Sequence, residues 1–223
     1  MSCLESFPEI VTPEFARFWG FMLGDGWQNG NVFGFARGIN DERNEYYENL
    51  LKKYSGKDKL SKIYSKTSKV KNSGVTVASK LFHHFMTING YVGKSYSKRL
   101  PNWIYECNEE TQLSLVKGLM DADGYVFTDK WNCNSYNLTL NNKELLQDLK
   151  SLLDRAKIKT GTIRSRKWTG KCNILGKEYN SKQSYDFTFY LDGKRKQQYT
   201  KYNLINSKYN VELFKIKSIT EEL

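Results

Sequence analysis

The stretch VKGLMDADG, residues 116–124, runs from an apolar helical pattern into two aspartates and a glycine, and a related stretch, FWGFMLGDG, occupies residues 18–26. The two stretches share two glycines, a methionine and the last aspartate, which is Asp25 in one and Asp123 in the other. A carboxylate just past a helix C-terminus faces the negative end of the helix dipole. The repeated placement therefore indicates that a bound cation compensates these aspartates.

Each copy opens a similar series of elements, which indicates an internal duplication. Helix start signals precede both copies: Thr12 and Pro13 in the first, and Asn108 followed by two glutamates in the second. The patterns that follow predict α+β halves with the order αββαββα, and each half is expected to form an antiparallel four-stranded sheet covered on one face. We expect an N-terminal repeat at 1–93, a linker at 94–107 that contains Pro101, and a C-terminal repeat at 108–223.

Charge and composition restrict the partners of the protein. The chain has 223 residues, a formal net charge of +11 and a pI near 9.3, which favours a polyanionic partner. Basic residues concentrate at 57–71 and 157–182, at similar places after the two motifs. No apolar run approaches the length of a membrane span and no secretion signal is recognisable, so we expect a soluble protein of the host cytoplasm or of an organelle. The four scattered cysteines predict neither a zinc site nor a disulfide framework.

Small residues recur four positions apart in both motif helices: Gly20 with Gly24, and Gly118 with Ala122. Residues at i and i+4 share a helix face, so the two helices are expected to pack closely and to bring their terminal aspartates together. Two neighbouring carboxylates repel each other, and hard oxygen ligands suit Mg²⁺. Two such ions can clamp the attacking and leaving oxygens of a phosphodiester.

These paired motifs resemble those of the LAGLIDADG homing endonucleases, in the form that carries both repeats on one chain. VKGLMDADG is a close match to the family motif and FWGFMLGDG is a looser one. The segment 97–126, SKRLPNWIYECNEETQLSLVKGLMDADGYV, particularly resembles the endonuclease domains found inside inteins. The resemblance extends over about residues 12–217.

The resemblance implies a monomeric, pseudo-twofold saddle of two sheets that straddles double-stranded DNA and cuts both strands across the minor groove. It implies that Asp25 and Asp123 are the metal-binding acids and that the main-chain carbonyls of Gly24 and Ala122 are further ligands. Two or three Mg²⁺ ions are expected, with Mn²⁺ or Ca²⁺ able to substitute for binding. Leu23 replaces the sixth motif residue of the first copy, so its counterpart Asp121 is interpreted as structural.

The resemblance also implies catalytic lysines. In intein endonucleases a lysine two residues before a hydrophobic–proline pair is catalytic, and this position is Lys98 in Lys98-Arg99-Leu100-Pro101. A lysine there can hold solvent near the scissile phosphate or offset charge in the transition state. The second half lacks a matching proline. Lys208 is our choice there because Ser207-Lys208 repeats Ser97-Lys98, and the competing positions are Lys194, Lys196 and Lys201.

Strand ribbons can enter the major groove and read base edges, while Lys and Arg anchor phosphates. Candidate DNA contacts on the outer sheet faces are Gln28, Asn29, Arg37, Lys62, Tyr64, Lys66 and Lys69 in the first half, and Lys130, Asn132, Asn134, Arg164, Arg166, Lys167 and Lys182 in the second. Each of these has a simpler alternative as a solvated side chain or a phosphate contact.

Three functions remain open from the sequence. The leading one is a site-specific endonuclease that cleaves both strands of duplex DNA at a long site. An RNA maturase and a non-cleaving DNA-binding regulator use the same scaffold, although the retention of both Asp25 and Asp123 favours cleavage. The sequence lacks an opening splice-junction cysteine block and a terminal His-Asn. We therefore expect a free-standing or excised endonuclease that does not splice.

Overall fold

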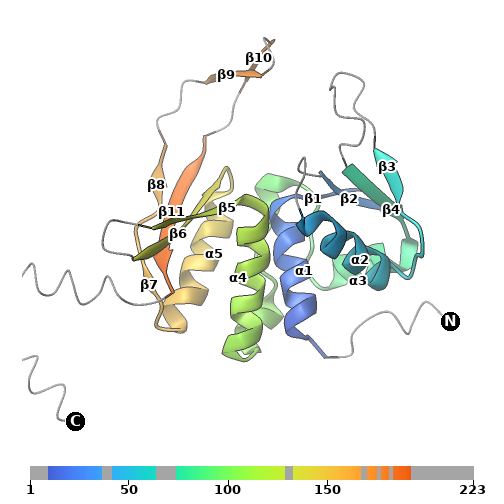
Figure 1. Ribbon diagram of the computed structural model, residues 1–223, viewed down its shortest axis with the longest axis horizontal. Helices are drawn as coiled ribbons and strands as arrows, with labels where there is room; N and C mark the ends of the chain where they lie inside the picture. The colour runs from blue at the N-terminus through green and yellow to red at the C-terminus, as the bar shows by residue number, and fades with distance from the viewer. Residues whose placement is uncertain are drawn as a thin grey trace, which may run out of the picture.

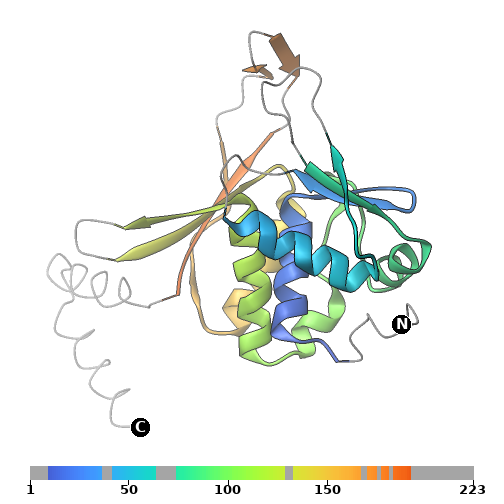
Figure 2. The same cartoon turned by 45° about the vertical axis from the view of Figure 1, so that its right-hand side comes forward.

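The computed structural model describes residues 10–36, 42–63, 74–128, 133–166, 170–174, 177–180 and 183–191. The centre of the molecule is a pair of helices, α1 (Pro13–Gly24) and α4 (Glu109–Asp123), which lie side by side in both views (Figures 1 and 2). Both begin at the expected caps, because Thr12 Oγ1 accepts a hydrogen bond from the amide of Phe15 and Asn108 Oδ1 accepts one from Thr111. The start signals in the sequence are therefore confirmed.

The two central helices pack backbone against backbone at their glycines. A Cβ atom added to Gly20 would overlap the carbonyl oxygen of Leu115, and one added to Gly118 would overlap that of Arg17. No side chain fits between the helices at these positions, so the small residues permit the close approach. The helix seam expected from the sequence is thus present.

The first half follows the expected αββαββα order. After α1 come β1 (Gly26–Asn29), β2 (Val32–Ala36), α2 (Arg43–Ser55), β3 (Ser61–Ile63), β4 (Gly74–Ala78) and α3 (Lys80–Ile88). The strands form an antiparallel sheet in the order β1-β2-β4-β3. Gly56 ends α2 in the left-handed conformation (φ 64°) that glycine adopts without strain.

The second half repeats this plan with two differences. Its elements after α4 are β5 (Gly124–Thr128), β6 (Asn134–Leu140), α5 (Lys143–Arg155), β7 (Lys159–Thr160), β8 (Arg164–Ser165), β9 (Lys171–Ile174), β10 (Lys177–Asn180) and β11 (Tyr185–Tyr190). The sheet has five strands rather than the expected four, because β7 and β8 pair with β11 as two separate short segments. β9 and β10 pair with each other in a two-stranded ribbon. The helix expected to close this half lies beyond the described residues.

Each sheet buries one face against helices and leaves the other face open. Phe33, Phe35, Val75 and Val77 supply the buried face of the first sheet. The buried face of the second sheet comes from Leu138, Leu140, Phe187 and Phe189. The two sheets flank the central helices on opposite sides (Figure 1). This arrangement matches the two-sheet architecture expected from the sequence.

The segment assigned as a linker, 94–107, packs into the structure. It contains two short 3₁₀ helices, Ser95–Ser97 and Asn102–Glu106, and it buries Leu100 and Ile104 in the core. Lys98 is also buried, with 1% of its surface exposed. The connection between the halves therefore contributes to the core and holds the one buried lysine of the described residues.

Within the described residues, no helix has both the length and the apolar character needed to cross a membrane.

Candidate active site

The two motif aspartates lie at the matching ends of the central helices. Asp25 is the C-cap of α1, and Asp123 is the last residue of α4. A Cβ atom added to Gly24, the neighbour of Asp25, would lie 2.8 Å from Asp123 Oδ2. Both carboxylates also interact electrostatically with the ammonium group of Lys98. The structure therefore brings the two aspartates and one lysine together at the C-terminal ends of α1 and α4.

Main-chain carbonyls at the end of α1 surround the Lys98 amine. Its Nζ donates hydrogen bonds to the carbonyl oxygens of Met22 (2.9 Å), Leu23 (2.9 Å), Gly24 (3.3 Å) and Gly26 (2.6 Å). The last carbonyls of a helix have no partner within the helix, and a cation there also faces the negative end of the dipole. Lys98 thus fixes the backbone on both sides of Asp25.

Burial and charge act in opposite directions on this lysine. Burial lowers the pKa of Lys98 to about 8, and the nearby carboxylates of Asp123 and Asp25 partly oppose that effect. Burial also raises the pKa of Asp123, with Lys98 acting in the opposite direction. A buried carboxylate with a raised pKa gains from additional positive charge, which a divalent cation supplies.

Two further residues hold this lysine in place. The Tyr91 hydroxyl donates to the carbonyl of Met22 at 3.0 Å, and the tyrosine ring lies beside the lysine, 5.9 Å from Nζ. Asn142 Nδ2 donates to the carbonyl of Lys98 at 2.7 Å while its Oδ1 caps α5 through the amide of Leu145. Hydrogen bonds therefore connect Lys98 to α1 of the first half and, through Asn142, to α5 of the second half.

Asp121, the sixth residue of the second motif, has the contacts of a structural residue. Its Oδ2 accepts hydrogen bonds from Arg17 Nε (2.8 Å) and Nη2 (2.7 Å) and from the hydroxyl of Tyr47. Arg43 donates to its main-chain carbonyl at 2.6 Å. These bonds join α4 to α1 and α2. Its counterpart Leu23 is buried in the core, so the two motifs use this position differently.

The oxygen donors at this site suit a hard divalent cation. Asp25 and Asp123 offer two carboxylates, and Mg²⁺ typically takes one or two carboxylates with water and phosphate oxygens. Of the two proposed carbonyl ligands, that of Gly24 already accepts a bond from Lys98. No group of three or more His, Cys, Asp or Glu side chains gathers as a metal site among the residues the structure describes. The donors present therefore fit an ion that completes its shell with water or substrate.

The sheet register decides which predicted DNA contacts face the open side. Residues paired across strands share a face, and alternate residues face opposite sides. Asn29 and Arg164 lie opposite Val32 and Asp186, on the open faces. Arg166 is exposed and pairs with Asp186 at 3.2 Å. These three candidates therefore lie toward the open sides of the sheets.

Three other candidates lie on the helix-covered side, contrary to expectation. Gln28 is opposite the buried Phe33, and its Nε2 lies 2.6 Å from His83 Nδ1 of α3. Lys62 and Asn134 lie opposite Val75 and Thr128, on the side toward which the buried core residues point, although Lys62 itself is exposed. Hydrophobic alternation along each strand fixes these faces. The remaining candidates lie outside the described residues: Arg37, Tyr64, Lys66, Lys69, Lys130, Asn132, Lys167, Lys182 and the proposed catalytic Lys208.

Besides Arg164, the open face of the second sheet carries polar residues that were not among the predicted DNA contacts. A hollow of about 420 Å³ lies over it, lined by Tyr125, Ser135, Asn137, Gly161, Thr162, Arg164, Asp186, Thr188 and Tyr190. Tyr136 and Leu138 alternate with polar residues along β6, a pattern typical of a half-buried strand. It could have identified Asn137 as facing the open side.

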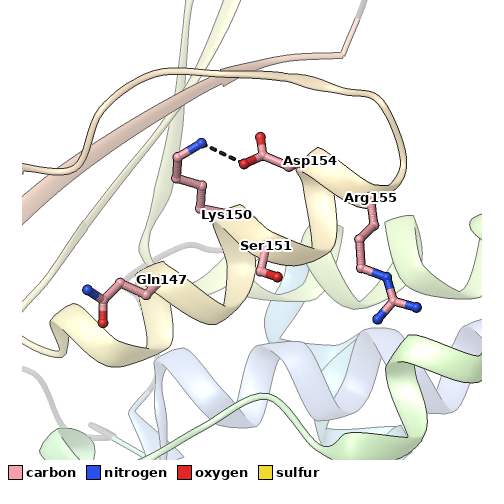
Figure 3. A pocket seen from close by; sticks show the side chains of 5 residues that line it. All are labelled: Gln147, Lys150, Ser151, Asp154 and Arg155. Atoms are coloured by element: carbon pink, nitrogen blue, oxygen red, sulfur yellow. Dashed lines mark hydrogen bonds and ion pairs between the residues drawn. The ribbon is translucent and has the colours of Figure 1, made fainter.

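A second hollow, on α5, is separate from the aspartates. Gln147, Lys150, Ser151, Asp154 and Arg155 line it, and Lys150 forms an ion pair with Asp154 at 2.7 Å (Figure 3). Asp154 also accepts a hydrogen bond from Thr160. Lys150, Asp154 and Thr160 bond to one another on the surface of α5 and β7, so we assign this hollow no role in the site.

Comparison with known proteins identifies the class of this fold. Residues 110–217 match the family described as a LAGLIDADG-like domain. The chain also resembles a structure of mesophilic variants of the homing endonuclease I-DmoI, with a TM-score of 0.51, 18% identity, and 83% and 93% of the two chains covered. A structure of I-DmoI in complex with DNA and Ca gives a TM-score of 0.55 at 17% identity, covering 84% and 88%. Likeness at this identity defines the fold.

Two curated proteins share part of the sequence. The chain is 34% identical over 93 residues to an iron–sulfur cluster assembly SufBD family protein of Mycobacterium leprae, and 30% identical over 153 residues to a DNA polymerase of Thermococcus hydrothermalis. The matches cover 42% and 64% of this chain but only 10% and 9% of those proteins. The chain thus spans about a tenth of the length of the curated relatives it matches.

The matched domain and the shared fold agree with the duplicated motifs. Residues 110–217 are similar to the LAGLIDADG-like domain family, and the fold, with two repeats on one polypeptide, is similar to that of the I-DmoI structures.

Proposed function

We propose that this protein is a site-specific homing endonuclease that cleaves both strands of duplex DNA by metal-dependent phosphodiester hydrolysis. The observation that carries the proposal is that Asp25 and Asp123 lie around the buried Lys98 at the C-terminal ends of α1 and α4. This position lies between two sheets with open faces. A protein that only bound DNA would have no need for two carboxylates at this point.

Each residue has a defined task in this proposal. Asp25 and Asp123 hold Mg²⁺, with Mn²⁺ and Ca²⁺ as substitutes for binding. The bound cations supply electrophilic stabilisation of the phosphodiester oxygens and lower the pKa of a bound water. Lys98 binds the carbonyls on both sides of Asp25, which orients this carboxylate. It also adds positive charge close to both aspartates. Lys208 remains our candidate for the second-half lysine.

The solved relatives support the substrate and the cofactor. The I-DmoI structures include complexes with DNA and Ca and with DNA and Mn, and they share the fold of this chain. The curated matches support an intein-like origin. Two proteins with unrelated names each contain a segment similar to this chain that makes up about a tenth of their length. Such a distribution is expected of an inserted domain, because their main activities have nothing in common.

The test is cleavage of a library of randomised DNA duplexes by the purified protein, in Mg²⁺ or with EDTA. We expect double-strand cuts at one long site in Mg²⁺ and none in EDTA. Asp25→Asn and Asp123→Asn should each abolish cutting while leaving duplex binding in Ca²⁺ intact. Asp58→Asn is the control for the loss of one carboxylate, because Asp58 is exposed and lies outside both motifs, and this variant should keep its cutting activity.

The outcomes separate the competing functions. Unchanged cutting by Asp123→Asn would refute the assigned role of this residue. Specific duplex binding without cutting in any divalent ion would indicate the DNA-binding regulator. Binding of structured RNA in preference to every duplex would indicate the maturase.

A further inference from the structure

The two sheets place matching rows of residues on their open faces, starting two positions after each motif aspartate. In the first sheet the row is Trp27, Gly34 and Thr76, which lie opposite one another on β1, β2 and β4. In the second it is Tyr125, Asn137 and Thr188, on β5, β6 and β11. The pairing registers make these rows equivalent under the pseudo-twofold relation.

An aromatic ring covers the middle residue of the first row. A Cβ atom added to Gly34 would lie 2.7 Å from Trp27 Cζ2 and 2.8 Å from Thr76 Cγ2. The tryptophan ring therefore covers the glycine and leaves no polar group in the middle of the row. The Thr76 hydroxyl donates only a long bond, 3.4 Å, to the carbonyl of Ser61.

The second row has an oriented amide at its middle position. Asn137 Oδ1 accepts a hydrogen bond from Thr188 Oγ1 at 2.6 Å, and its Nδ2 donates to the carbonyl of Ser135 at 3.0 Å and to its hydroxyl at 3.3 Å. These bonds fix which end of the amide is oxygen. An amide oxygen has two lone pairs, and Thr188 occupies one. Asn137 therefore presents a directed acceptor.

The surroundings of Asn137 fit a base edge. The hollow of about 420 Å³ above the row is flanked by Tyr125, which is 58% exposed, and by Tyr190. Asp186 at the neighbouring position is already bonded to Thr139 (2.7 Å) and Arg166 (3.2 Å). Its negative charge is thereby compensated, so the row can approach DNA.

We propose that the two sheets read DNA unequally, and that Asn137 is a specificity-determining residue for which the first half has no equivalent. Asn137 Oδ1 accepts a hydrogen bond from an exocyclic amino group, which adenine and cytosine present in the major groove. The matching row of the first sheet has no polar group at its middle position, because the ring of Trp27 covers Gly34. This inference rests on the proposed DNA-binding function and adds the distribution of specificity between the half-sites.

The test measures base preference rather than cleavage. The protein and its variants select duplexes from the randomised library in Ca²⁺, and the base preference at each bound position is compared. Asn137→Leu removes the acceptor and keeps the branched shape and the number of heavy atoms of the side chain. We expect the preference for adenine or cytosine over guanine or thymine to fall about tenfold at one position of one half-site.

Two variants sharpen the test. Asn137→Asp keeps the acceptor oxygen, so it should retain this preference while its added negative charge weakens binding to all duplexes alike. Thr76→Val, the matched control in the first half, should leave every preference unchanged. Thermal melting shows whether each variant is folded.

The results separate this inference from the proposed function. A protein that selects no duplex at all would overturn the proposed function together with the inference. Specific selection that is unchanged in a folded Asn137→Leu variant would overturn the inference alone. Equal loss of preference in Thr76→Val and Asn137→Leu would also overturn it, because the two sheets would then read alike.

Discussion

The two motif helices end in the same Asp-Gly pair, yet they are secured there in different ways. At the end of α1, four main-chain carbonyls converge on the ammonium group of Lys98. At the end of α4, the side chain of Asp121 is held by Arg17 and Tyr47 of the first half. Asp25 is thus positioned by the buried Lys98, and Asp123 by the bonds of the neighbouring Asp121.

The difference shows how a duplicated structure has become a single unit. Lys98 comes from the connection between the halves and is tied to the second half through Asn142. Asp121 belongs to the second half but bonds to residues of the first. Each motif end therefore depends on residues outside its own repeat, and the pair of aspartates is positioned only in the complete chain.

The largest expected effect comes from the close packing of α1 against α4 at their glycines. Gly118→Ala places a methyl group against the backbone carbonyl of Arg17, which forces the helices apart. We expect the free energy of unfolding to fall by about 3 kcal/mol, measured by urea denaturation. Lys117→Ala, at an exposed position of the same helix, is the control and should change little. A loss below about 1 kcal/mol for Gly118→Ala would contradict the tight seam.

The second effect tests the lysine that holds α1. Lys98→Met keeps much of the side-chain volume but leaves the surrounding carbonyls without their donor. We expect destabilisation of about 2 kcal/mol and slower cleavage in Mg²⁺ even where the variant is fully folded. Lys94→Met, at an exposed position of the same segment, is the control. Equal melting temperatures for the two variants would show that Lys98 does not secure the helix end.

A smaller effect is expected at the corresponding anchor of α4. Asp121→Asn removes the negative charge that Arg17 contacts, while an acceptor oxygen remains. We expect a loss of about 1.5 kcal/mol, and a double-mutant cycle with Arg17→Gln should show that the two losses are not additive. Additive losses would mean that this ion pair contributes nothing to the position of α4.

The smallest effect has the opposite sign. Burial raises the pKa of Asp123, so the folded protein holds this proton more tightly than the unfolded chain does. Its contribution to stability is therefore present at low pH and is lost as the pH rises through the folded-state pKa. Asp123→Asn, which does not titrate, should raise the melting temperature in EDTA by about 2 °C at pH ~8. An increase at low pH but none at high pH would contradict this assignment.

Short-range sequence patterns determine much of the fold. Thr12 and Asn108 start the motif helices, and the spaced glycines produce the close helix pair, as predicted. Such signals depend on a few neighbouring residues, because a cap or a helix face is set by chain positions three or four apart. The convergence of Asp25 and Asp123 follows directly from these signals.

Only the tertiary structure decided which strand residues face outward and what surrounds Lys98. Gln28 and Asn134 were predicted as DNA contacts from their residue types, yet the register places them on the helix-covered side and Asn137 on the open side. A shift of one residue in register reverses the face of every side chain, and that register depends on cross-strand partners far away in the sequence. The carbonyl shell of Lys98 likewise forms between residues more than seventy positions apart, a distance that no local pattern spans.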